Sequence, residues 1–137
     1  MVTRVLDTSV AAKWFFQEEG TDRALALLRE LLERRSRVQV PSSFSYELAS
    51  VLWTRRSSAF SEREAREVWA ELATFPITIV DGAELLPEAI LFAFEHGLTV
   101  YDAVFVGLAR QAGCELITAD RVLWETVTGD CPWVKRL

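Results

Sequence analysis

The fold is decided by the stretch Arg4-Val5-Leu6-Asp7-Thr8-Ser9. Its short apolar run predicts a buried strand, and the polar residues that follow predict the turn that ends this strand. Further along, residues 21–35 carry leucine and alanine at helical spacing, which predicts an amphipathic helix. A strand followed by a helix is the first unit of an α/β fold.

The rest of the chain continues this alternation. Short apolar or β-branched runs predict strands, and longer periodic runs between Gly, Pro and capping residues predict helices. The predicted strands are 38–40, 77–80 and 115–118, with an edge-strand candidate at 133–135. The further predicted helices are 11–16, 43–52, 61–72, 83–96, 102–111 and 121–128. We therefore expect one α/β domain, residues 1–137, with a central mostly parallel sheet and helices on both faces.

Length and composition exclude several classes of protein. The chain has 137 residues, of which 50% are hydrophobic, so it can fill one core and is not a disordered tail. No apolar run approaches the roughly 20 residues that span a bilayer, and the first residues do not resemble a signal peptide. We therefore expect a cytoplasmic protein without a membrane partner. Cys114 and Cys131 are too far apart for a CxxC motif, which favours free thiols.

The net charge of −5 argues against a protein that coats duplex DNA through bulk electrostatics. It does not exclude a nuclease, because bound metal ions restore positive potential locally. Arginines gather at residues 34–37 and at Arg55-Arg56. The simpler interpretation of both groups is a solvated helix end.

Three acidic residues fall where strands are expected to pass into helices. Asp7 follows the first strand directly, and Asp120 follows the strand 115–118 by two residues. Asp102 opens a helix immediately after Leu98-Thr99-Val100, which we take as a third such junction. Because the carboxyl ends of parallel strands share one edge of the sheet, we expect these acids to meet there. Glu47 borders the apolar stripe of its helix, so it can reach inward to the same place.

Each acid also has a purely structural alternative. Asp102 and Asp120 both suit the N-cap position of a helix. Asp7 suits an Asx turn, and Glu47 suits a solvated helix face. Taken one at a time these alternatives are favoured, whereas the topology that gathers three acids at one edge favours a shared site.

A shared carboxylate site points to metal chemistry. Carboxylates held together repel one another unless a cation neutralises them. Mg²⁺ and Mn²⁺ suit carboxylate and water oxygens, and such ions can activate water for attack on a phosphodiester. The single histidine, His96, leaves no convincing Ser-His or Cys-His nucleophile in competition.

The residues around these acids resemble the PIN-domain ribonucleases of the VapC toxin type. All four acidic positions occur in the expected order, and the resemblance spans nearly the whole chain. The matching segments are Val5-Leu6-Asp7-Thr8-Ser9-Val10-Ala11-Ala12-Lys13-Trp14-Phe15, Ser45-Tyr46-Glu47-Leu48 after Pro41-Ser42, Tyr101-Asp102-Ala103 and Thr118-Ala119-Asp120.

This resemblance implies a Mg²⁺- or Mn²⁺-dependent endoribonuclease that hydrolyses RNA, forms a homodimer and is neutralised by a small cognate antitoxin. It implies a type II toxin–antitoxin system. The metal ligands and catalytic residues that it implies are Asp7, Glu47, Asp102 and Asp120. It further implies that the hydroxyls of Thr118 and Ser9 support the metal or the phosphate.

Aromatic residues gather on or near the first helical segments, at Trp14, Phe15, Phe16, Phe44 and Trp53. Core packing accounts for most of them, and the alternative is a hydrophobic groove for an amphipathic antitoxin helix. Among the basic residues, Arg4, Lys13 and Arg23 flank the expected acidic edge. They either contact RNA phosphates or remain solvated.

Other small α/β proteins fit the pattern less well. A phosphoacceptor signalling domain needs adjacent acids after the first strand and a lysine after a late strand. A haloacid-dehalogenase-type phosphatase needs an acid where this chain has Ser9. Two alternatives stay open, a non-catalytic interaction domain with this fold and a PIN nuclease that processes RNA without an antitoxin.

Overall fold

The computed structural model of the chain describes residues 1–137 and contains one five-stranded parallel sheet in the order β3-β2-β1-β4-β5. The strands are β1 (Val2–Leu6), β2 (Ser36–Pro41), β3 (Ile77–Val80), β4 (Glu115–Thr118) and β5 (Val134–Arg136). The helices are α1 (Thr8–Ala12), α2 (Thr21–Leu32), α3 (Ser43–Thr54), α4 (Glu62–Leu72), α5 (Leu86–His96), α6 (Val100–Ala112) and α7 (Arg121–Val127), with a 3₁₀ turn η1 (Gly82–Leu85). The predicted α/β class is confirmed, and the sheet is entirely parallel.

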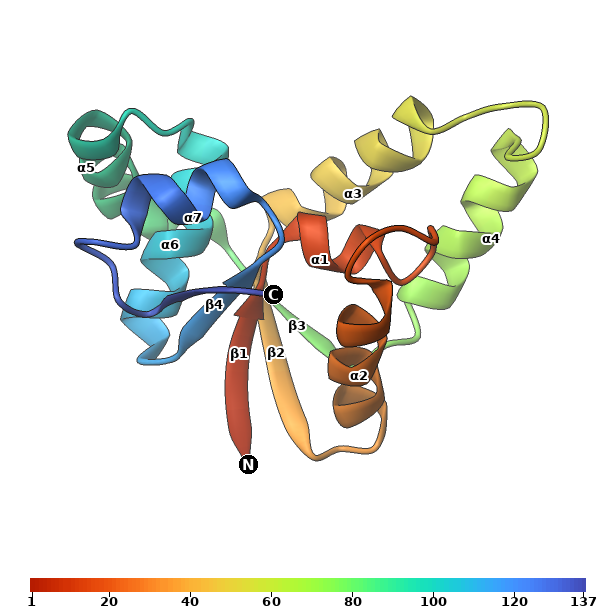
Figure 1. Cartoon of the computed structure of the whole chain (residues 1–137), viewed down its shortest axis with the longest axis horizontal. Coiled ribbons are helices and arrows are strands. Elements are labelled where there is room, and N and C mark those ends of the chain that lie inside the picture. Colours follow the sequence, from red (N-terminus) through yellow and green to blue (C-terminus); the bar gives the residue numbers. More distant parts are fainter.

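The helices form a layer on each face of the sheet (Figure 1). From β1 the chain moves outward through β2 to β3, and its connections place α1 to α4 on one face. It then crosses back to β4 and continues to β5, which places α5 to α7 on the other face. Right-handed crossovers dictate this reversal, because the direction of travel across the sheet changes.

The reversal leaves β1 and β4 as neighbours although they are far apart in the sequence. Leu6 is paired with Ile117, and the Asp7 N–H donates to the Ile117 carbonyl oxygen at 3.0 Å. This is the switch point of the sheet, where an open α/β fold leaves a crevice beyond the strand ends. The end of β1 and the end of β4 therefore lie side by side at the mouth of that crevice.

The core lies between the sheet and its helices, and α6 is the most deeply buried helix. Phe105 and Val106 in its middle are fully buried, and α6 packs across β1, β2 and β4. No single helix has both the length and the apolar character that a bilayer crossing requires. Only the bent pair Gly82–His96 and Val100–Ala112, at 117° to each other, meets that requirement jointly.

Two local predictions are wrong. The first helix covers Thr8–Ala12 rather than residues 11–16, because the chain turns into it directly after Asp7. Leu98-Thr99-Val100 is not a strand end. Gly97 (φ 68°) ends α5, and Thr99 caps α6 through a bond from the Asp102 N–H to Thr99 Oγ1 at 3.1 Å. A left-handed glycine followed at once by an N-cap joins two helices and leaves no extended segment to pair with the sheet.

Candidate active site

Asp7 stands at the centre of the carboxyl edge of the sheet. It is 6% exposed, and two hydroxyls donate to its Oδ2, Ser9 Oγ at 2.6 Å and Thr118 Oγ1 at 2.9 Å. Burial raises the pKa of Asp7 against the lowering effect of these two bonds, and the charge of Asp120 adds to the rise. A buried carboxylate with hydroxyl partners and no cationic partner is costly to keep ionised.

Thr118 and Asp120 come to this place from β4. Thr118 is fully buried at the last position of the strand, and its Oγ1 also accepts from the Asp120 N–H at 3.0 Å. Asp120 is the N-cap of α7, where its Oδ1 accepts from the Leu123 N–H at 3.1 Å. The capping alternative is thus correct for Asp120. Its charge nevertheless acts on Asp7, because β4 and β1 are neighbours.

Glu47 approaches from α3 on the same face as α1. The Thr8 hydroxyl donates to Glu47 Oε2 at 3.0 Å, so this glutamate points to the end of β1 and not into solvent. Burial raises the pKa of Glu47 to about 7, against the lowering effect of the Thr8 bond and with help from the charges of Asp7 and Asp102. The prediction that Glu47 reaches inward is confirmed.

Asp102 reaches the site from α6, across the switch point. It is the third residue of that helix, whose N-cap is Thr99, so the capping alternative for Asp102 is wrong. Because α6 returns from the carboxyl edge to the start of β4, its first turn lies at the same edge as Asp7. Burial, and then the charges of Asp7 and Asp120, raise the pKa of Asp102.

A cavity of about 370 Å³ lies over these residues, and its walls include Asp7, Glu47 and Asp102, with Ala119 beside Asp120. None of the four acids takes part in an ion pair. As they stand, no three of these acids lie close enough together to hold a metal ion. Carboxylates that repel one another at the mouth of a cavity suit a hard divalent cation.

The same cavity has a second wall of opposite character. It contains Lys13 and Arg55, and both cations bind the carboxylate of Glu18. We call these three residues the cation cluster. Lys13 therefore flanks the acids as predicted. Sequence reasoning missed Glu18 and took Arg55 for a solvated helix end, because nothing in the local pattern shows that α3 ends beside the loop after α1.

The other two predicted flanking cations, Arg4 and Arg23, do not line this cavity. Arg4 pairs with Glu30 at 2.7 Å, on the strand side of α2. Arg23 lines a small adjacent hollow together with Arg136, and this hollow shares Lys13 and Ala119 with the cavity of the acids. Neither side chain lines the cavity of the acids.

Comparison with known proteins places the chain in a family. The sequence profile of the PIN domain matches residues 4–127. The chain is 34% identical over 124 residues to Ribonuclease VapC3 of Pyrobaculum aerophilum, which covers 88% of this chain and 92% of that protein. It is 33% identical over 100 residues to Ribonuclease VapC9 of Mycobacterium tuberculosis, covering 70% and 75% of the two chains.

Solved structures share the fold at lower sequence identity. A toxin-antitoxin complex from Klebsiella pneumoniae matches with a TM-score of 0.69 at 15% identity, over 96% of this chain and 95% of that chain. The profile match covers most of the chain, and the match to VapC3 runs over nearly its whole length. This chain belongs to the PIN-domain family, among its VapC ribonucleases.

Proposed function

We propose that this protein is a divalent-metal-dependent endoribonuclease and the toxin of a type II toxin–antitoxin pair. The observation that carries the proposal is that three carboxylates without ion-pair partners, from α3, α6 and the β4–α7 junction, lie around the buried Asp7 at the end of β1. Such a group of carboxylates does not stabilise the fold by itself, because the charge of each acid makes it more costly to ionise its neighbours. The names of the VapC relatives supply the RNA substrate for the proposal.

Asp7, Asp102, Asp120 and Glu47 fit the ligand chemistry of Mg²⁺ or Mn²⁺, which prefer carboxylate oxygens and retain several waters. Once bound, the ion supplies an activated water and stabilises negative charge on the phosphate and the leaving oxygen. Within the chain, Asp7 provides the fixed carboxylate. Glu47 and Asp102 are only partly buried, so their side chains can adjust toward a cation.

Ser9 and Thr118 hold the carboxylate of Asp7 in one orientation. Both hydroxyls donate to the same oxygen, Oδ2, while Thr118 accepts from the Asp120 N–H and Ser9 Oγ accepts from the Ala119 N–H at 3.0 Å. One pair of hydroxyls thus ties the end of β1 to the β4–α7 junction. We infer that Thr118 and Ser9 position the acids rather than react themselves.

Cleavage of RNA tests the proposed activity. Purified protein is incubated with total RNA in Mg²⁺, in EDTA, and as the Asp7→Asn variant. We expect cleavage only in the first tube, because the other two remove the ion or its fixed ligand. Asp7→Asn should lower the rate by at least about 1,000-fold while the circular dichroism spectrum stays unchanged. Equal cleavage in all three tubes would rule the proposal out.

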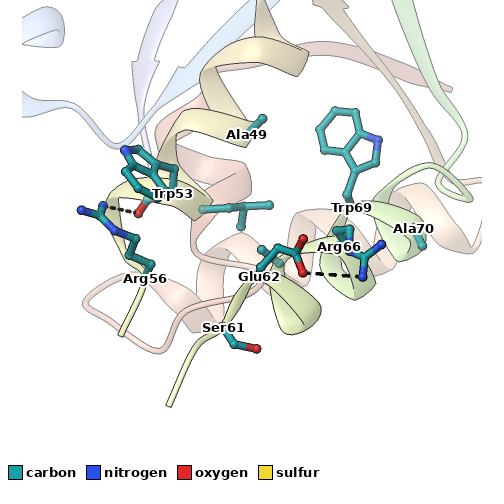
Figure 2. Close-up of a pocket in the computed structure, with 10 residues that line it drawn as sticks. Ala49, Trp53, Arg56, Ser61, Glu62, Arg66, Trp69 and Ala70 are labelled. Atoms are coloured by element: carbon teal, nitrogen blue, oxygen red, sulfur yellow. Dashed lines mark hydrogen bonds and ion pairs between the residues drawn. The ribbon is translucent and has the colours of Figure 1, made fainter. Parts of the chain in front are cut away.

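The antitoxin is the proposed protein partner. Solved complexes with this fold include toxin–antitoxin pairs, and the molecule has a surface suited to an amphipathic helix. This surface is an apolar groove of about 620 Å³ between α3 and α4, where Trp53 and Trp69 stand on opposite walls (Figure 2). Trp53 is 64% exposed, and the Arg56 guanidinium lies 3.4 Å from the centre of its ring.

Of the aromatic residues predicted for this groove, only Trp53 lines it. Trp14 and Phe15 pack against Phe75 in the core, and Phe44 is buried. The double variant Trp53→Ala, Trp69→Ala should keep its ribonuclease activity and escape inhibition by the small protein encoded beside the gene. Leu25→Ala on helix α2, outside the groove, is the control. If the small protein inhibits both variants equally, the groove is not its binding site.

We further propose a homodimer that acts on RNA in the cytoplasm. Helix α5 exposes four large apolar side chains, Leu86, Ile90, Leu91 and Phe94, with Phe94 87% exposed. A patch of this kind on a small protein suits association with a second copy. Phe94→Glu should shift the mass measured by light scattering from dimer to monomer, and an unchanged mass would exclude this face.

A further inference from the structure

The cavity over the acids presents an electrostatic problem for the proposed substrate. An RNA phosphodiester is an anion, the cavity walls carry Asp7, Glu47 and Asp102, and the whole chain has a net charge of −5. Like charges at contact distance repel strongly where solvent is partly excluded. A backbone phosphate therefore needs positive groups beside it in addition to the catalytic ion.

The cation cluster is fixed in place at this cavity. Glu18 Oε1 accepts from Lys13 Nζ at 3.2 Å, while Glu18 Oε2 lies 2.8 Å from Arg55 Nη1. Lys13 Nζ also donates to the Glu19 carbonyl oxygen at 2.6 Å. The Arg55 guanidinium lies over the Phe16 ring, 4.7 Å from its centre. Both cations are held by two contacts each.

The loop that carries Glu18 is itself anchored. The Glu18 N–H donates to the buried Thr21 Oγ1 at 3.0 Å, and this hydroxyl donates to the Phe16 carbonyl oxygen at 3.1 Å. The pKa of Glu18 lies below its ordinary value: partial burial opposes this shift, and the bonds and charges of Arg55 and Lys13 outweigh it. The lowered pKa favours the ionised form of Glu18, which lies on an anchored loop between two cations.

One carboxylate cannot neutralise two cations, so the cluster keeps a net positive charge. The ion pair with Glu18 involves Arg55 Nη1, whereas a guanidinium has five N–H donors in a planar fork suited to phosphate oxygens. We propose that Lys13 and Arg55 bind the backbone phosphate of the RNA strand beside the metal-binding acids, and that Glu18 positions them. This inference rests on the proposed ribonuclease function and adds the residues that hold its substrate.

Binding without cleavage tests the inference. All variants are made in the Asp7→Asn background and titrated, in Mg²⁺ at several salt concentrations, against a fluorescein-labelled single-stranded RNA of mixed sequence. Arg55→Gln should weaken binding about 10-fold, because a charge-assisted contact is lost. It should also reduce the slope of log affinity against log salt by about 0.7, the value for one phosphate contact on a single strand. Arg55→Lys should retain the slope.

The matched control is Arg63→Gln on α4, an exposed arginine that pairs only with Glu67 and lies outside the cavity. It removes the same charge and should leave both affinity and slope unchanged. Equal binding by the Arg55→Gln variant and its parent, or an equal loss in the Arg63→Gln control, would overturn the inference. A parent that binds no RNA at all would instead contradict the proposed function.

Glu18→Ala separates positioning from bulk charge. It removes a negative charge from the cavity, so electrostatics alone would tighten RNA binding. If Glu18 positions Lys13 and Arg55, the variant should bind RNA several-fold more weakly, with little change in its melting temperature. Tighter binding would show that the two cations need no anchor and would overturn that part of the inference.

Discussion

The two walls of the cavity over the acids place their carboxylates in opposite electrostatic surroundings. On one wall Asp7, Glu47 and Asp102 face each other without cationic partners, and the pKa of Glu47 rises to about 7. On the other wall Glu18 lies between two cations, and its pKa falls below its ordinary value. The cation cluster is complete within the chain, whereas the acids have no cationic partner in the chain, which suits the proposed metal ion. Addition of metal and substitution of residues should therefore affect stability and binding differently on the two walls.

Divalent metal should change the stability of the protein more than any of the substitutions below, and it should act only by binding to the acids. Mg²⁺ at about 100-fold above its Kd should raise the free energy of unfolding by about 2.7 kcal/mol, because it binds only the folded site. Thermal denaturation with and without Mg²⁺ measures this rise. Glu18→Ala should retain it and Asp7→Asn should lose it. A rise that survives Asp7→Asn would place the ion elsewhere.

Thr118→Val should have the next largest effect. Valine keeps the shape of the fully buried side chain but removes the hydroxyl that bonds to Asp7 Oδ2 and to the Asp120 N–H. We expect a loss of about 2 kcal/mol in the free energy of unfolding measured by urea denaturation, since the partly buried Asp120 N–H and the buried Asp7 Oδ2 each lose a hydrogen bond. Thr126→Val, whose exposed hydroxyl bonds only to the Val122 carbonyl oxygen, is the control and should lose little. Equal losses of stability in the two variants would show that the contact of Thr118 with Asp7 contributes no more than an exposed hydroxyl contact.

Replacing one glutamate on each wall by glutamine should change the free energy of unfolding by small amounts of opposite sign. The folded-state pKa of Glu47 is raised, so the metal-free protein loses stability as pH rises from about 4.5 to 7 and does not regain it above. Glu47→Gln avoids that loss and should stabilise the metal-free protein at pH 8 by about 1–2 kcal/mol, after allowance for solvent screening.

Glu18→Gln is the counterpart on the other wall. The pKa of Glu18 is lowered, so its stabilising contribution is present above the unfolded pKa and is lost as pH falls through the folded value. The substitution should therefore destabilise the protein slightly at pH 8. Chemical denaturation in EDTA measures the free energy of unfolding of both glutamine variants. If both variants are stabilised, or both destabilised, the proposed contrast between the two walls is wrong.

Much of the site can be predicted from the order of residues along the chain. Asp7 and Asp120 follow strands, and the prediction that parallel strands bring them to one edge is confirmed by the pairing of Leu6 with Ile117. The place of Glu47 beside an apolar stripe predicts that it points inward, and the hydrogen bond from Thr8 confirms this. Asp102 does lie at this edge, but the reason given from the sequence is wrong, because Asp102 lies in the first turn of a helix that follows another helix and not a strand.

The cation cluster and the groove between α3 and α4 are much harder to predict from the sequence. Lys13, Glu18 and Arg55 carry no pattern of their own, because a charged residue in a loop or at a helix end is ordinarily solvated. Trp69 lies in the predicted helix 61–72 and is not among the aromatic residues assigned to the groove from sequence, yet it faces Trp53 across the groove. Such contacts depend on how the loop after α1 and helices α3 and α4 pack, which spacing does not specify.

The sequence by itself determined the α/β alternation, the order of the acids and the family resemblance, because periodicity and capping act over a few residues. The tertiary structure alone decided which charges meet. It placed Thr118 against Asp7 and Arg55 against Glu18 across long separations in the chain. The pKa of a carboxyl depends on burial and on neighbours within a few ångströms, and the fold, not the local sequence, sets both.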